Sequence, residues 1–186
     1  MHAKIKIFGV PKISEKFFRT KKDEDKRKKH KGLLVVEKDD KNAEEYLQKA
    51  KTNLEFCGIY KEKRLDYKIP EEWFYTMYYC ALAILSKFGV ETRNQICTAL
   101  FLSYVKDKGL INYDDEFIDR ITVYSDKDVK SDVDEREDAR YGSSIEINEV
   151  EQNYDKMMGR CKEAISQCEE IVFSESKFDI PEELVK

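Results

Sequence analysis

The sequence predicts an all-α protein, because charged residues are abundant, glycine and proline are scarce, and apolar residues recur with helical spacing. Charged residues make up 39% of the 186 residues, above the roughly 25% typical of soluble domains. Only seven residues are Gly and three are Pro, which disfavours the turn-rich connections of a β-sandwich or barrel. A chain of 22.0 kDa with 41% apolar residues is large enough for one domain with a hydrophobic core.

Two long helices are predicted in the first half of the chain. From Asn42 to about Lys63, apolar residues recur at steps of three and four, and Asn42 with Glu45 has the spacing of a capping box. A second helix begins at Pro70, which is tolerated in a first turn, and ends at Gly89. The apolar residues of this second helix are Trp73, Phe74, Met77, Tyr78, Ala81, Leu82, Ile84, Leu85 and Phe88. They cover most of its circumference, so we expect it at the centre of the bundle or in a subunit interface.

Shorter helices are predicted in the middle of the chain. Thr92 and Gln95 form another capping pair and open a helix that ends at Gly109. Short helices are predicted over residues 114–124 and 132–140.

The last and longest predicted helix covers residues 148–173 and carries an unbroken apolar stripe. Cys161 and Cys168 lie on this stripe, seven residues apart. The five cysteines of the chain are odd in number and widely spaced, which is typical of reduced thiols in a core rather than of disulfides or a zinc site. We expect no metal and no cofactor.

Basic residues are concentrated at the N-terminus. Residues 1–31 contain twelve Lys or Arg and four acidic residues, a net charge of +8. Since the whole chain carries −4, the other 155 residues carry −12. We expect residues 1–31 to form a flexible arm before a bundle over residues 32–173 and a C-terminal tail over 174–186. The arm is either a solvated segment or a tether for a nucleic-acid backbone. The acidic segment 112–140 is a candidate partner for it.

The sequence also predicts where the protein resides. Its longest apolar stretch, residues 73–85, is thirteen residues long, short of the roughly 18 needed to cross a bilayer. The apolar residues near the N-terminus alternate with lysines and do not form the apolar segment of a signal peptide. We therefore expect a cytoplasmic protein without membrane contact.

Several kinds of chemistry are disfavoured. The two histidines, His2 and His30, lie in the predicted arm, which leaves the predicted bundle without histidine-based acid–base catalysis. The aspartates between residues 126 and 134 resemble a calcium loop, but a lysine stands at a ligand position and the required glycine is missing. No glycine-rich phosphate loop occurs.

Three sequence motifs, together with the order of the predicted helices, resemble those of the HEPN domain family. They are WFYTMYYCALAILSKFG at residues 73–89, TRNQICTAL at 92–100 and EREDARYG at 135–142. The resemblance covers about residues 32–173 and is closest to the archaeal and bacterial branch often encoded beside minimal nucleotidyltransferases. It implies an up-and-down bundle of four to five helices, usually a homodimer, in a family rich in RNA-cleaving toxins and RNA-processing factors.

The resemblance also implies the site residues. The family pattern is an arginine, four to six other residues and a histidine, facing the dimer cleft. Arg136 matches the arginine, and the histidine position falls on Tyr141. The resemblance thus implies Arg136 and Tyr141 as the catalytic positions of a metal-independent ribonuclease, although a tyrosine of pKa about 10 is a poor base at neutral pH.

Further arginines are candidate ligands of RNA or a nucleotide. Arg140 lies four residues after Arg136, so the two share a helix face and form either a phosphate clamp or salt bridges to neighbouring carboxylates. Arg93 and Asn94 echo another form of the family signature. They are either nucleotide-binding residues or solvent-facing residues beside the predicted Thr92 cap.

Two functional hypotheses follow. The first is a HEPN-like protein that binds or cleaves RNA as a component of a toxin–antitoxin or RNA-processing system. The second is a non-catalytic dimeric module that binds a nucleotide or docks a nucleotidyltransferase partner.

Overall fold

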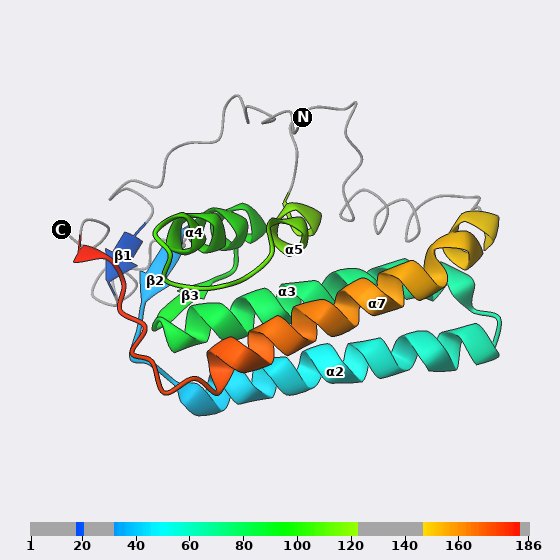
Figure 1. Cartoon of the computed structure of the whole chain (residues 1–186), viewed down its shortest axis with the longest axis horizontal. Helices are drawn as coiled ribbons and strands as arrows, with labels where there is room; N and C mark the ends of the chain where they lie inside the picture. Colours follow the sequence, from blue (N-terminus) through cyan, green and yellow to red (C-terminus); the bar gives the residue numbers. More distant parts are fainter. Residues whose placement is uncertain (1–17, 21–31, 123–146, 183–186) are drawn as a thin grey trace, which may run out of the picture.

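Three long helices form the body of the protein. In the computed structural model, which describes residues 18–20, 32–122 and 147–182, α2 (Asp40–Glu62), α3 (Ile69–Lys87) and α7 (Ile147–Val172) run side by side along the molecule (Figure 1). The chain reverses between α2 and α3. Lysines of α2 pair with glutamates of α7, Lys51 with Glu169 at 2.6 Å and Lys61 with Glu151 at 3.2 Å. Because residue numbers rise in one helix as they fall in the other, α7 is antiparallel to α2 and therefore parallel to α3.

Two shorter helices lie over another side of α3 (Figure 1). They are α4 (Gln95–Asp107) and α5 (Asp115–Arg120), held together by an ion pair of 2.6 Å between Lys106 and Asp115. The rings of Phe88, at the end of α3, and Phe101, in α4, meet edge to face with centroids 5.4 Å apart. The predicted all-α bundle is confirmed, with α3 at its centre. None of the helices in the described part of the chain combines the length and apolar character needed to cross a bilayer.

A small sheet, which was not predicted, closes one end of the bundle. It contains β1 (Phe18–Thr20), β2 (Leu33–Val35) and β3 (Val90–Thr92), with β1 parallel and β3 antiparallel to β2. Leu33 and Val90 are buried in the core. Each strand has three residues, too few to show the alternation that identifies a strand in a sequence. β1 belongs to the segment expected to be a flexible arm, and the structure attaches it to β2 at this point.

The start of α2 differs from the predicted capping box. Asp39 is the N-cap, and its carboxylate oxygen Oδ1 accepts the backbone N–H of Asn42 at 2.9 Å. The side chain of Asn42 instead donates to the hydroxyl of Ser86, at 3.2 Å, and so joins α2 to the end of α3. The predicted pairing of Asn42 with Glu45 is wrong, because an aspartate three residues earlier supplies the cap and the asparagine is recruited by a tertiary contact.

The segment after α7 packs against the body. The ring of Phe178 is only 8% exposed and lies 5.2 Å from that of Phe88. The carboxylate of Asp179 pairs with Lys38 at 2.5 Å. The described part of the expected C-terminal tail is therefore anchored by one aromatic side chain and one ion pair.

The five cysteines are free and buried, which confirms the prediction of reduced core thiols. Cys168 donates its S–H to the backbone carbonyl of Cys80 at 3.4 Å, and Cys161 to that of Trp73 at 3.8 Å. These contacts connect α7 to α3 along the apolar stripe.

The turn between α2 and α3 contains a backbone conformation that favours glycine. The N–H of Leu65 donates to the carbonyl of Tyr60 at 2.8 Å, and the N–H of Arg64 to that of Lys61 at 3.1 Å, which is the Schellman pattern at a helix end. Arg64 occupies the left-handed position, with φ of 57°. An L-residue with a Cβ is strained there, and glycine is the usual occupant.

We predict that Arg64→Gly stabilises the fold by about 0.5 to 1 kcal/mol, because relief of the left-handed strain outweighs the added freedom of the unfolded chain. The measurement is urea unfolding followed by circular dichroism, in which the midpoint should rise at constant slope. Lys63→Gly, one residue earlier at φ of −86°, is the matched control and should be destabilising. A lower midpoint for Arg64→Gly would contradict the assignment of strain.

Candidate functional site

The central site residues predicted from the family resemblance lie outside the described residues. Arg136, Arg140 and Tyr141 all belong to residues 123–146, so their roles stay predictions. In the sequence, Tyr141 precedes Ile147, the first residue of α7, by six positions.

Arg93 and Asn94 are described, and they lie at the start of α4. Asn94 is the N-cap, since its Oδ1 accepts the backbone N–H of Cys97 at 3.1 Å. The hydroxyl of Thr92 accepts the backbone N–H of Asn94 at 3.0 Å, so the predicted cap at Thr92 is wrong by two residues. Arg93 is exposed between them. The oxygen of Asn94 thus has a structural partner, whereas Arg93 is accessible to a ligand.

The described residues contain a cluster of four tyrosines on one face of α2 and α3, which we call the aromatic face. Its members are Tyr46, Tyr75, Tyr78 and Tyr79, all of them half-buried. The ring of Tyr79 stacks on both sides, with centroids 6.1 Å from Tyr46 and 5.9 Å from Tyr75. The ammonium of Lys49 lies 5.0 Å from the centre of the Tyr46 ring and 5.9 Å from that of Tyr79. The result is a continuous row of rings with one cation over it.

Tyr75 and Tyr79 mark the side of α3 that no other described helix covers, whereas Tyr78 lies within hydrogen-bonding reach of Thr98 in α4. Positions along α3 rotate by about 100° per residue, so Tyr75, Tyr79 and Leu82 fall on one side of the helix. These three are only partly buried, while residues on the sides facing α2, α7 and α4 are buried. Sequence reasoning identified the apolar circumference of this helix, but which side lacks cover depends on how the other helices pack.

Three phenols of the aromatic face, those of Tyr46, Tyr78 and Tyr79, have a raised pKa. Burial raises the pKa of Tyr78 and of Tyr79, and burial together with the Glu91 carboxylate raises that of Tyr46. The hydroxyls of Tyr46, Tyr78 and Tyr79 therefore act as neutral donors and acceptors and not as bases.

A carboxylate beside the aromatic face titrates near neutrality. Burial, assisted by the neighbouring Glu71, raises the pKa of Glu72 to about 7, while Lys68 acts in the opposite direction. A carboxyl group that exchanges protons at neutral pH is a frequent feature of functional sites. It was not visible in the sequence, because its burial arises only when α2 and α3 pack.

An acidic cavity of about 590 Å³ lies between β2, the start of α2 and the end of α3. The carboxylates that line it are Glu37, Asp39 and Glu91, together with the polar side chains of Asn42 and Ser86. Glu91 connects it to the aromatic face through its effect on Tyr46. A cavity of this charge disfavours phosphate groups and suits a cationic or hydrogen-bonding ligand.

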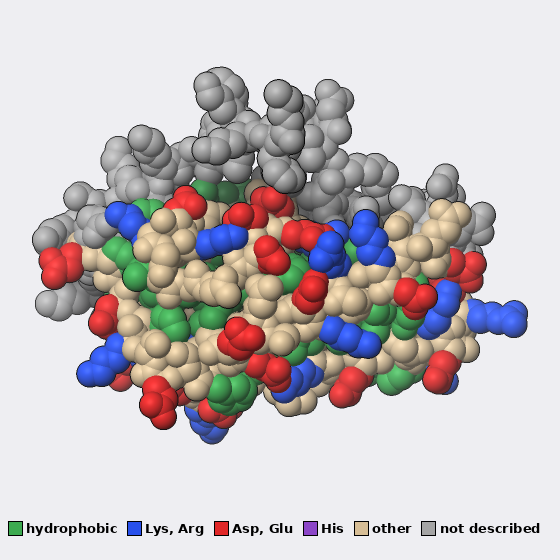
Figure 2. All heavy atoms as spheres, viewed as in Figure 1, with side chains coloured by type: hydrophobic (Ala, Val, Ile, Leu, Met, Phe, Trp, Pro, Cys, Tyr) green, Lys and Arg blue, Asp and Glu red, His purple; other side chains and the backbone are tan. Residues whose placement is uncertain are grey.

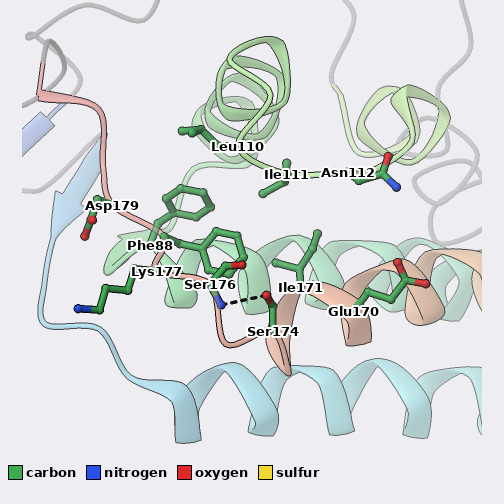
Figure 3. A pocket seen from close by; sticks show the side chains of 11 residues that line it. Phe88, Leu110, Ile111, Asn112, Glu170, Ile171, Ser174, Ser176, Lys177 and Asp179 are labelled. Carbon is green, nitrogen blue, oxygen red and sulfur yellow. Dashed lines mark hydrogen bonds between the residues drawn. The ribbon is translucent and has the colours of Figure 1, made fainter.

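A second cavity, of about 290 Å³, lies beneath the segment that follows α7 (Figure 3). Its walls include Phe88, Ile111 and Phe178, and the Ser174 hydroxyl accepts the backbone N–H of Ser176 at 3.1 Å. No histidine is available among the described residues to activate these serines. The cavity is best explained by the packing of the terminal segment.

Charge on the visible surface is mixed. Figure 2 shows acidic and basic side chains interspersed over α2 and α7.

Among residues 18–20, 32–122 and 147–182, no group of three or more His, Cys, Asp and Glu could hold a metal ion.

A comparison of the chain with protein-family models, with curated proteins and with solved structures found no match. The function proposed for this chain therefore rests on its own residues.

We predict that Glu72→Gln stabilises the protein at pH 8 by about 1 kcal/mol, a value reduced for the partial exposure of the group. The pKa of Glu72 is raised in the folded state, so its stabilising contribution is present at low pH and is lost as the pH rises through about 7. The neutral glutamine avoids that loss. Thermal unfolding at pH 5.5 and pH 8 measures the difference.

The gain from Glu72→Gln should be smaller at pH 5.5, where the native carboxyl is already protonated. Glu44→Gln, at an exposed carboxylate of α2, is the control and should have the same small effect at both pH values. An equal effect of Glu72→Gln at both pH values would contradict the raised pKa.

Proposed function

We propose that the chain is a HEPN-like helical protein that binds or cleaves RNA as a homodimer, within a toxin–antitoxin or RNA-processing system. The observation that carries the proposal is the central, nearly all-apolar helix α3 with one uncovered aromatic face. It supports the dimer expected from the family resemblance, in which the active cleft lies between two subunits.

The composition of the aromatic face suits a subunit interface. Aromatic residues are enriched in protein interfaces, where they bury a large area at a low cost in side-chain entropy. The stacking of Tyr46, Tyr79 and Tyr75 orders the rings before any partner arrives. A second copy of the chain, related by a two-fold axis near α3, would cover Tyr75, Tyr79 and Leu82 with the same residues.

The chemistry is assigned to the EREDARYG segment. In the proposed site, Arg136 binds the scissile phosphate through its guanidinium fork, Arg140 adds a second cation and Arg93 is a further candidate contact. Tyr141 hydrogen-bonds to the attacking ribose hydroxyl. Since a phenol of ordinary pKa is a weak base at neutral pH, we expect cleavage to be slow.

The alternative, a non-catalytic dimeric module, is favoured by two observations. Tyr141 stands in place of the family's histidine, and the chain outside the basic arm carries a net charge of −12. An acidic surface repels an RNA backbone and suits a basic protein partner such as a nucleotidyltransferase subunit. The acidic cavity beside Glu91 would in this case receive part of that partner or a nucleotide's base.

We predict that the protein sediments at micromolar concentration with twice the mass of one 22.0 kDa chain. Replacing Tyr75 and Tyr79 by aspartate should shift it to a single-chain mass without loss of helicity, because both side chains are partly exposed in one subunit. Phe173→Asp, at a position 61% exposed beyond α7, is the control and should remain dimeric. A parent protein that sediments only as a single chain would exclude the dimer.

We predict slow, metal-independent cleavage of RNA, measured with EDTA present. Arg136→Ala should reduce the rate at least about 100-fold, the usual size of a lost catalytic contact. Tyr141→His should increase it, because imidazole titrates near neutral pH. Lys162→Ala, an exposed lysine on α7, is the control. If the dimer binds RNA or a partner but neither the parent nor Tyr141→His cuts RNA, the non-catalytic alternative is correct.

A further inference from the structure

A half-buried carboxyl group continues the row of rings along the uncovered side of α3. Glu72, Tyr75 and Tyr79 follow one another at steps of three and four residues, so their side chains leave the helix on one side. We propose that Glu72 is a proton-sensitive contact of the dimer interface, so that two copies of the chain associate while it is neutral and separate when it becomes charged. This inference rests on the proposed dimer and adds the regulation of its interface.

The position of Glu72 makes it part of any interface that covers these rings. The hydroxyl of Thr76 donates to the carbonyl of Glu72 at 2.8 Å and approaches that of Ala50 at 3.4 Å, which seats the start of α3 against α2. Glu72 precedes Tyr75 by less than one helical turn, about 4.5 Å along the axis. A second copy that covers Tyr75 and Tyr79 therefore also contacts the Glu72 side chain.

The Glu72 carboxyl has no partner that would hold it in its charged form. Within the described part of the chain it forms no hydrogen bond and no ion pair. Glu71 beside it repels a second negative charge, and Lys68 is the cation that favours the charge. From α2, the facing titratable group is the thiol of Cys57, and the next ring along α3 is that of Tyr79; the Glu72 charge raises the pKa of both. A carboxylate in these surroundings is costly to remove from water.

The other charged groups of the aromatic face lie near Tyr46. The ammonium of Lys49 is 5.0 Å from the centre of the Tyr46 ring, and the Glu91 carboxylate of β3 acts on the Tyr46 phenol. Neither Lys49 nor Glu91 contributes to the shift at Glu72. The proton sensitivity is therefore assigned to the part of the face nearest the start of α3.

Association and protonation are linked through the cover of this carboxyl. Burial within one chain already raises the pKa of Glu72 to about 7. A second copy removes more water from the carboxyl and raises that pKa further, because burial disfavours the charged form. A group whose pKa is higher in the dimer than in the single chain takes up a proton on association, so the affinity depends on pH.

The sign of the dependence follows from the raised pKa. Below about pH 7 the carboxyl is already neutral in the single chain, and the dimer loses nothing. As the pH rises above 7, association requires either uptake of a proton or burial of a charge in each subunit. The dimer is thus strongest in mildly acidic solution and weakens as the pH rises.

Other titrations are separated from that of Glu72 by range or by variant. Burial raises the pKa values of Tyr46, Tyr78 and Tyr79 from their ordinary value near 10, so these phenols stay neutral between pH 6 and pH 8. His2 and His30 titrate near pH 6.5 in unperturbed form and lie outside the described residues. A pH dependence that came from the histidines would persist when Glu72 is replaced.

The test is the dissociation constant of the full-length dimer at pH 6 and pH 8, measured by sedimentation equilibrium. It should be at least about 10-fold higher at pH 8, since complete suppression of the charge in both subunits corresponds to about 100-fold. Glu72→Gln should have the same dissociation constant at both pH values, within about 2-fold, and should match the parent at pH 6, because glutamine is neutral throughout.

Glu44→Gln is the matched control. Glu44 is an exposed carboxylate of α2, about 160° around the helix axis from Tyr46. This variant removes the same charge away from the aromatic face, so it should keep the pH dependence of the parent.

The reciprocal measurement follows the carboxyl itself. The pKa of Glu72, read from the carboxyl resonance of ¹³C-labelled glutamate and assigned with Glu72→Gln, should be higher above the dissociation constant of the dimer than below it. The same pKa at both protein concentrations would overturn the inference.

The outcomes distinguish this inference from the proposed function. If the parent dimerises with equal affinity at pH 6 and pH 8, or if the dependence survives in Glu72→Gln, the role of Glu72 is wrong and the dimer stands. If the parent sediments as a single chain at both pH values, the dimer and the role of Glu72 are both wrong.

Discussion

The structure depends on one constraint, which is that α3 is apolar around nearly its whole circumference and must be covered on every side. α2 and α7 cover two sides, and α4 with α5 covers a third (Figure 1). The small sheet and the anchored Phe178 close the end of α3 around Phe88. What remains is the aromatic face, where Tyr75 and Tyr79 are only partly buried. The described residues of one chain leave this side open, and a second copy is the cover that we propose.

The two ends of the α2–α3 pair differ in chemistry because their neighbours differ. At the sheet end, Glu37, Asp39 and Glu91 form an acidic cavity. At the turn between α2 and α3, Lys61 pairs with both Asp66 and Glu151. These two ion pairs fasten the turn to α7.

The long helices could be predicted from the sequence, whereas the features that depend on tertiary contacts could not. Apolar periodicity, Pro70 and Gly89 were enough to locate α3, and the stripe containing Cys161 predicted α7. The capping residues were misassigned because Asp39 and Asn94 compete with other good caps a few residues away. Phe178 stands in a polar tail without a regular repeat of apolar residues, so its packing could not be predicted from the sequence. The raised pKa of Glu72 arises from burial in the folded protein, and the turn between α2 and α3 has Arg64 where a glycine would have marked it.

Hydroxyl-radical footprinting of the tyrosines tests the cover of α3 most directly. Tyr75 and Tyr79 should be oxidised several-fold more slowly above the dissociation constant of the dimer than below it, because a second subunit excludes water from the aromatic face. Tyr67, 42% exposed in the turn between α2 and α3, should react at the same rate at both concentrations and serves as the internal reference. Equal oxidation of Tyr75 and Tyr79 at all concentrations, at a rate fitting their exposure in one chain, would show that α3 needs no second copy and would contradict the proposed dimer.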